Sequence, residues 1–197
     1  GVQTCALPIY PLTACIVLTE LAAGDVGIAS VLAQTSMLAH ALFDGAMSAE
    51  QRARFLPAFI ADENYHLAYA SQLSAPDTEW SYHRPGTALE SKLDVQRDGG
   101  DWVFNGEIAQ VANAPLAKLF VVSVRHAGAG HALLLPADTR GLALHGPTER
   151  PQWYHGTRGT LRFDHCRIPA TNLLARGCSD QSPSAALQRN RSEEHTS

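Results

Sequence analysis

The stretch that decides the fold is Asp101–Arg125, DWVFNGEIAQVANAPLAKLFVVSVR, near the middle of the chain. It opens with the bulky β-formers of residues 102–104, directly after the turn-forming residues 98–100, which predicts one arm of a hairpin. Asn105-Gly106 is the strongest short turn signal in the chain. Residues 119–124, LFVVSV, form an apolar run whose β-branched content favours a buried strand. We therefore predict two strands closed by an Asn-Gly turn, a polar crossing and a buried strand, at the centre of a β domain.

Composition places the chain among soluble globular proteins. It has 197 residues, which is enough for one large or two small domains. Hydrophobic residues make up 45% and charged residues 17%. The net charge is -4 with no basic patch, so no nucleic-acid partner is expected. No apolar run approaches membrane-spanning length, so we expect no membrane span.

Metal chemistry is not predicted either. The nine His are scattered, and the four Cys form no C-x-x-C pair. His165 and Cys166 are adjacent, and on a strand they would point to opposite faces and not share a metal ion. The expectation is no metal, reduced thiols and a cytoplasmic location.

The two ends of the chain look like translated adapter DNA rather than genuine protein sequence. The last residues, RSEEHTS, can be encoded by AGATCGGAAGAGCACACGTCT, and the first residues, GVQTCALPI, by GGAGTTCAGACGTGTGCTCTTCCGATC. The second string contains nearly all of the reverse complement of the first. We expect Gly1–Ile9 and Arg191–Ser197 to be translated sequencing adapter, and the chain to be an internal fragment of a longer one.

Upstream of the central stretch the sequence predicts three helices. The first covers residues 10–23, and the second begins after the N-cap Asp25 and runs to about Phe43, with Gly45 as its stop. The third begins with a capping box, Ser48–Gln51, and Pro57 should kink it or end its first half. The predicted buried stripe of the second helix is Ile28, Val31, Leu32, Thr35, Leu38, Ala39 and Leu42. That of the third is Phe55, Leu56, Phe59 and Ile60.

From about residue 62 extended segments dominate. Besides the central stretch, strands are predicted at 67–71, 88–97, 131–135, 141–144 and 160–163. Arg158-Gly159 is expected to be a turn, and Ile168-Pro169 should end the sheet. The predicted fold class is α+β: an N-terminal helical segment followed by a mainly antiparallel β barrel or sandwich. The expected domains are a partial helical domain at 10–62, a β domain at 63–174, and a disordered or artefactual tail at 175–197.

Four segments in this order resemble the acyl-CoA dehydrogenase family, over roughly Glu20–Leu174. Ser48–Asp62 is similar to the family's helix with a Leu-Pro near its end. Trp102–Arg125 looks like its strand, Asn-Gly turn and crossing into an apolar strand. Leu133–Leu142 is similar to a strand with an Asp-x-x-Gly turn, and Gly156–Leu174 resembles the segment ending in Phe-Asp, Val-Pro and Asn-Leu-Leu.

The resemblance implies an FAD-dependent oxidoreductase acting on the CH–CH group of acyl-CoA thioesters. In the family FAD lies between the middle β domain and C-terminal helices, which this fragment is expected to lack. The carboxylate that takes the substrate proton usually lies in those helices, so no catalytic residue is assigned. The implied partners are an acyl-CoA thioester and further subunits of the same type, in a homo- or hetero-oligomer.

The cofactor-binding residues that the resemblance implies are Ser71 and Val111. Ser71-Gln72-Leu73 matches the family's Thr-Glu-Pro, so Ser71 keeps a hydroxyl for the flavin ring while Gln72 is a neutral replacement of the acid. Gln110-Val111-Ala112 matches Trp-Ile-Thr, where only Val111 is a fair equivalent. Main-chain N–H donors at 70–72 and 111–112 are expected to persist.

Two alternatives stay open at this point. The departures from the flavin motifs suit a non-catalytic, structural subunit of the same family. Without the resemblance, a β sandwich with three flanking helices suits a binding module with no chemistry.

Overall fold

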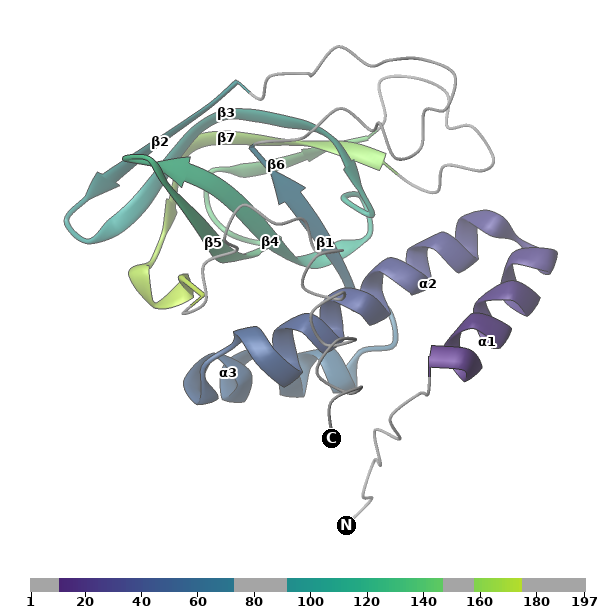
Figure 1. Ribbon diagram of the computed structural model, residues 1–197. Coiled ribbons are helices and arrows are strands. Elements are labelled where there is room, and N and C mark those ends of the chain that lie inside the picture. The colour runs from purple at the N-terminus through teal and green to yellow at the C-terminus, as the bar shows by residue number, and fades with distance from the viewer. Residues whose placement is uncertain (1–10, 73–91, 147–157, 175–197) are drawn as a thin grey trace.

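The computed structural model describes residues 11–72, 92–146 and 158–174 (Figure 1). Helices precede two β-sheets along the chain, and the helices lie against one side of the β part (Figure 1). The predicted tail at 175–197 and the proposed adapter segments lie outside the described residues.

The first two helices begin and end close to where the sequence places them. They are α1 (Pro11–Gly24) and α2 (Val26–Ala39). Asp25 is the N-cap of α2, and its side chain accepts a hydrogen bond of 2.9 Å from the Ile28 N–H. The predicted stop at Gly45 is early by one residue, because the chain continues as the π-helix η1 (His40–Ala46).

The capping box of α3 (Ala49–Ala61) is confirmed. Ser48 Oγ accepts from Gln51 N at 3.2 Å, and Gln51 Oε1 accepts from Ser48 N at 3.0 Å. Pro57 does not end the helix, which runs on to Ala61. Phe55 is buried as predicted, whereas Ile60 is 59% exposed.

The expectation that no apolar run reaches membrane-spanning length is wrong. Residues Val26–Ala46 form a helical stretch of 21 residues, with a mean hydropathy of 1.5, that is long and apolar enough to cross a bilayer. A core helix of a soluble protein meets the same criterion, so this stretch alone does not place the chain in a membrane.

The strands form two sheets, with the orders β1-β4-β5 and β2-β3-β7-β6. Neighbouring strands are antiparallel except for the parallel pair β1–β4. The predicted α+β class with a mainly antiparallel β part is therefore confirmed. The bounds are β1 (His66–Ser71), β2 (Lys92–Asp98), β3 (Asp101–Ala112), β4 (Ala117–His126), β5 (Ala129–Pro136), β6 (Leu142–His145) and β7 (Arg158–Ile168).

The predicted turn at Asn105-Gly106 is wrong. Both residues lie inside β3, and the β2–β3 hairpin turns instead at Gly99 and Gly100, which have φ of 59° and 97°. Asn105-Gly106 marks a β-bulge, where the register of β3 against β7 shifts. Gly106 has φ 116°, and a Cβ there would lie 1.8 Å from Lys92 O. The glycine is needed for close strand approach rather than for chain reversal.

Arg158-Gly159, predicted as a turn, also lies within a strand. Both residues belong to β7, where Gly159 pairs with Val111 and Arg158 with Ala112. The predicted sheet end is confirmed, because β7 stops at Ile168 and Pro169 follows.

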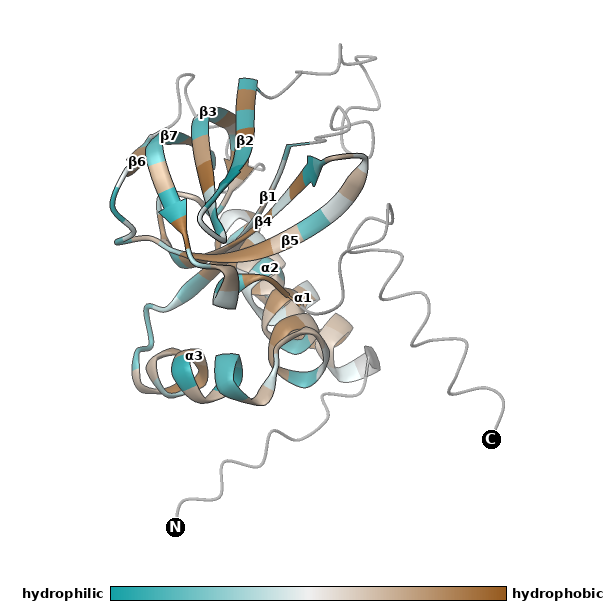
Figure 2. Cartoon of the chain, turned by 90° about the vertical axis from the view of Figure 1, so that its left-hand side faces the viewer, coloured by the Kyte–Doolittle hydropathy of each residue, from teal (hydrophilic) through white to brown (hydrophobic). Residues whose placement is uncertain are grey.

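Two hydrophobic cores share the strand β4. Phe120, Val122 and Val124 point into the core between the two sheets, whereas Leu119 and Val121 point to a second core beneath the helices. This double burial explains why residues 119–124 are almost continuously apolar (Figure 2).

The predicted buried stripe of α2 is buried only in part. Val31 and Leu42 are buried, as predicted, but Ile28 is 56% exposed and Leu32 40% exposed. The buried side of α2 is therefore narrower than the sequence pattern indicates.

Candidate functional site

The end of β3 is distorted in the segment that the sequence matches to a flavin contact. Pairing with β7 jumps from Ile108↔Leu161 to Val111↔Gly159, so an extra residue of β3 is inserted there. Gln110 has φ 57° and Asn113 φ 62°, both in the left-handed region. Such backbone strain gathers at functional sites, and a bulge frees main-chain polar groups from the ladder.

Asn113 holds this distorted segment in place. It is only 2% exposed, and its Nδ2 donates to Val31 O on α2 at 3.1 Å and to Leu67 O on β1 at 3.4 Å. One buried carboxamide thus joins a helix, the edge strand of one sheet and the end of a strand from the other. Asn113 is not among the residues predicted from the sequence. The sequence signal that could have indicated Asn113 is a polar residue directly after a predicted strand.

Val111 and Gln110 of the matched triplet lie in different surroundings. Val111 is buried in the core between the sheets, so a ligand can meet it only through its main chain. Gln110 is exposed on the bulge, and its carbonyl accepts from Arg158 Nη1 at 3.5 Å. A flat side chain at position 110 would therefore stand on the surface of the β part.

Ser71 is the last residue of β1 and pairs with Ser123 of β4. It is partly exposed and has interactions of its own. Gln72 follows, and its N–H donates to Ser123 O at 2.8 Å. The main-chain donor at 72, expected to face a cofactor, is therefore used within the fold.

Ser71 and Val111 lie in different sheets and at the ends of their strands. Ser71 ends β1, and Val111 lies at the end of β3 that Asn113 ties to Leu67, near the start of β1. Strands β1 and β3 contact each other across the two sheets. Ser71 therefore lies at the far end of β1 from the Asn113–Leu67 bond, along the seam where β1 of one sheet contacts β3 of the other.

Other reactive groups among the described residues do not form a competing site. Burial raises the pKa of the Cys166 thiol to about 11, so it is protonated and a poor nucleophile at neutral pH. A hydrogen bond from Lys118 lowers the pKa of the Asp62 carboxyl, which stands on the surface. In the part of the chain that the structure describes, His, Cys, Asp and Glu form no metal-binding cluster.

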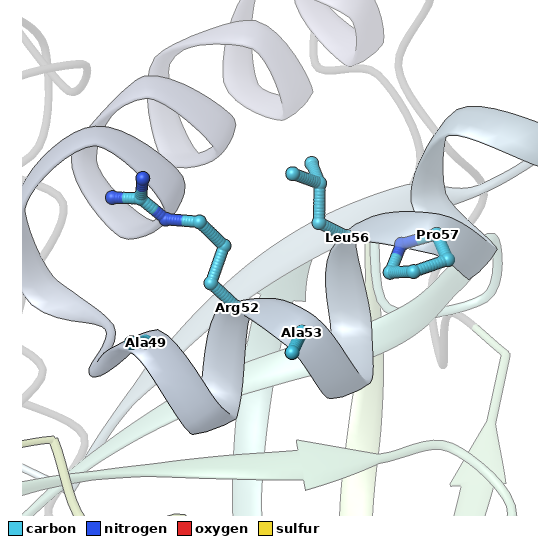
Figure 3. A pocket seen from close by; sticks show the side chains of 5 residues that line it. All are labelled: Ala49, Arg52, Ala53, Leu56 and Pro57. Carbon is cyan, nitrogen blue, oxygen red and sulfur yellow. The ribbon is translucent and has the colours of Figure 1, made fainter.

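A surface hollow of about 420 Å³ lies on α3, away from the seam. Ala49, Arg52, Ala53, Leu56 and Pro57 line it (Figure 3). All five come from one helix, and the hollow offers a single charged group, so it does not resemble an enclosed cofactor site.

Comparison with known proteins agrees with this architecture. The family model for the acyl-CoA dehydrogenase N-terminal domain matches residues 7–63. Mitochondrial isobutyryl-CoA dehydrogenase of Dictyostelium discoideum is 26% identical over 174 residues, which cover 84% of this chain and 38% of that protein. The glutaryl-CoA dehydrogenase of Mycobacterium smegmatis, solved in complex with FADH2, superposes with a TM-score of 0.67 at 25% identity. It covers 91% of this chain, and the chain covers 44% of it.

The chain is similar to acyl-CoA dehydrogenases in sequence and in fold. A further relative, the amino sugar nitrososynthase RubN8 of Streptomyces rubradiris, is 40% identical over 100 residues, covering 47% of this chain and 23% of that protein. The chain thus spans less than half the length of each of these relatives.

Proposed function

We propose that the complete protein is an FAD-dependent oxidoreductase that acts on the CH–CH group of acyl-CoA thioesters, as a homo- or hetero-oligomer in the cytoplasm. The observation that carries the proposal is the distorted end of β3, with left-handed Gln110 and Asn113 on either side of the matched Val111-Ala112. The match of residues 7–63 to the acyl-CoA dehydrogenase N-terminal domain and the FADH2 bound to a similar glutaryl-CoA dehydrogenase support it.

The residues of this chain would hold the cofactor rather than perform the chemistry. FAD accepts the hydride when bound. Ser71 would donate its hydroxyl to the flavin ring, and Val111 would present its main chain, since its side chain belongs to the core. Both residues belong to the β domain proposed at 63–174, and Asn113 links their seam to α2 of the helical domain proposed at 10–62. The residue that takes the substrate proton is not assigned.

Binding should be weaker than in a site with the full motifs. Ala112 supplies no hydroxyl, and one neutral hydrogen bond contributes on the order of 1 kcal/mol. Gln110 supplies no indole, which removes a comparable aromatic contribution of roughly 1 kcal/mol. Together these losses correspond to a roughly tenfold to hundredfold higher Kd for FAD.

A second candidate is flavin-dependent oxidation of an amino group. The relative named as an amino sugar nitrososynthase shares a higher identity over its 100 matched residues than the isobutyryl-CoA dehydrogenase does over 174. The loss of the Trp-Ile-Thr match fits a changed substrate, because a fold can carry different chemistries.

The test is to purify the complete protein, record its flavin absorption and titrate it anaerobically with acyl-CoA thioesters. Bleaching of the flavin supports the acyl-CoA proposal. Bound flavin that is bleached by no thioester, together with oxidation of an amino sugar, supports the second candidate. Flavin absent from the wild type but gained by Gln110→Trp/Ala112→Thr supports a non-catalytic subunit, and flavin absent from both rejects the site.

A further inference from the structure

The side-chain amide of Gln72, the residue after β1, bonds to β2 of one sheet and to β4 of the other. Its Nε2 donates to Leu93 O of β2 at 3.0 Å, and its Oε1 accepts from Arg125 N of β4 at 2.8 Å. Its main-chain N–H donates to Ser123 O of β4 at 2.8 Å. Strands β1 and β2 are edge strands of their respective sheets, so the bond to Leu93 O joins the edges of the two sheets. The two bonds to β4 hold Gln72 to the sheet that contains β1.

Both halves of the amide are needed for this arrangement. Leu93 offers a carbonyl, which requires a donor, and Arg125 offers an N–H, which requires an acceptor. A carboxylate has acceptors only, so a glutamate would keep the bond from Arg125 but face Leu93 O with a second acceptor. The replacement of the family's acid at this position is thus a change of hydrogen-bonding capacity as well as of charge.

We propose that Gln72 is a positioning residue for the flavin site. It directly follows Ser71, and its three hydrogen bonds fix the end of β1 between β2 and β4. These bonds hold the backbone next to the Ser71 hydroxyl between β2, which pairs with β3, and β4. The inference rests on the proposed binding of FAD.

The experiment measures the Kd for FAD and the Tm of the complete protein, in wild type, Gln72→Glu and Gln72→Met, from about pH 8 down to about pH 4.5, close to the ordinary glutamate pKa of about 4.3. At pH 8 both variants should raise the Kd at least tenfold. On acidification toward the ordinary glutamate pKa of about 4.3, Gln72→Glu should recover part of its affinity, because a protonated acid regains a donor for Leu93 O. Gln72→Met has neither group and should not recover.

Gln51→Glu is the matched control. Gln51 is a buried amide elsewhere in the fold, whose Nε2 donates to Thr171 O at 2.8 Å and Leu173 O at 2.9 Å in the segment that follows β7. Its replacement should lower the Tm and leave the Kd for FAD unchanged. If Gln72→Glu behaves in the same way, Gln72 is merely structural and the inference is overturned. A wild type without FAD would reject the proposed function itself, and the role of Gln72 with it.

Discussion

At the residue scale, Asn113 shows how one side chain can fix a strained backbone. Its φ of 62° is tolerated because asparagine enters the left-handed region more readily than most residues, and its amide bonds to Val31 O and Leu67 O stabilise that conformation. The distortion at the end of β3 therefore depends on contacts with α2 and β1.

Replacing Asn113 separates the contribution of its side-chain hydrogen bonds from that of left-handed backbone strain. Asn113→Ala loses both side-chain bonds and adds left-handed strain, so we expect the free energy of unfolding to fall by about 2–4 kcal/mol. Asn113→Gly loses the same bonds without the strain and should be about 1 kcal/mol less damaging. Urea denaturation of the three proteins measures both differences. Equal stability of the alanine and glycine variants would show that the backbone there is not strained.

The roles of the capping residues Ser48 and Gln51 could be predicted from the sequence, whereas that of Asn113 could not. The reason is that the partners of Asn113 lie far away along the chain. The partners in the capping box are three positions apart, so the pattern is visible locally. Asn113 is 82 positions from Val31 and 46 from Leu67. The same holds for Gln72, whose partner Arg125 lies 53 positions away.

At the element scale, the misplaced turn within β3 shows what an Asn-Gly pair can mean. Asn105 Oδ1 accepts from His165 N at 2.8 Å, and Gly106 allows β2 to approach closely. The pair shapes a bulge across three strands, whereas the Asp-Gly-Gly sequence before it makes the hairpin. Both patterns favour positive φ, and only the pairing of β3 with β7 distinguishes them.

A glycine required for close strand approach and a glycine in an open turn should therefore differ in how much stability is lost on substitution. In Gly106→Ala the new Cβ would lie 1.8 Å from Lys92 O, so the strands must separate. We expect a loss of about 3 kcal/mol or more, from overpacking and positive φ together. Gly128→Ala is the control, because Gly128 has φ 81° and a Cβ added there would meet nothing within 4 Å. It should lose about 1–2 kcal/mol, from strain alone. Similar losses in the two variants, by thermal unfolding, would contradict the close-approach explanation.

At the scale of the whole molecule, the order of helices and strands could be predicted, and the burial of the helices could not. Periodicity identified the amphipathic stripe of α2, but burial depends on what packs against it. Val31 and Leu42 are buried, whereas Ile28 and Leu32 remain exposed. Helix α1 packs on α2 (Figure 1), and its Ile16 and Val17 are exposed.

These exposed apolar side chains of α1 and α2 should make the chain self-associate. The exposed fractions are 55% for Ile16, 49% for Val17, 56% for Ile28 and 40% for Leu32. Exposed apolar surface favours association. We expect oligomers or aggregates in size-exclusion chromatography with light scattering. Ile28→Gln/Leu32→Gln should reduce them, with the free energy of unfolding changed by only about 0.5 kcal/mol per site, since both side chains already face solvent.

Val31→Gln, at a buried position of the same helix, should destabilise the fold instead. A monodisperse wild-type monomer with a sharp cooperative melt would contradict this prediction, and unchanged association in the double variant would place the contact on another face.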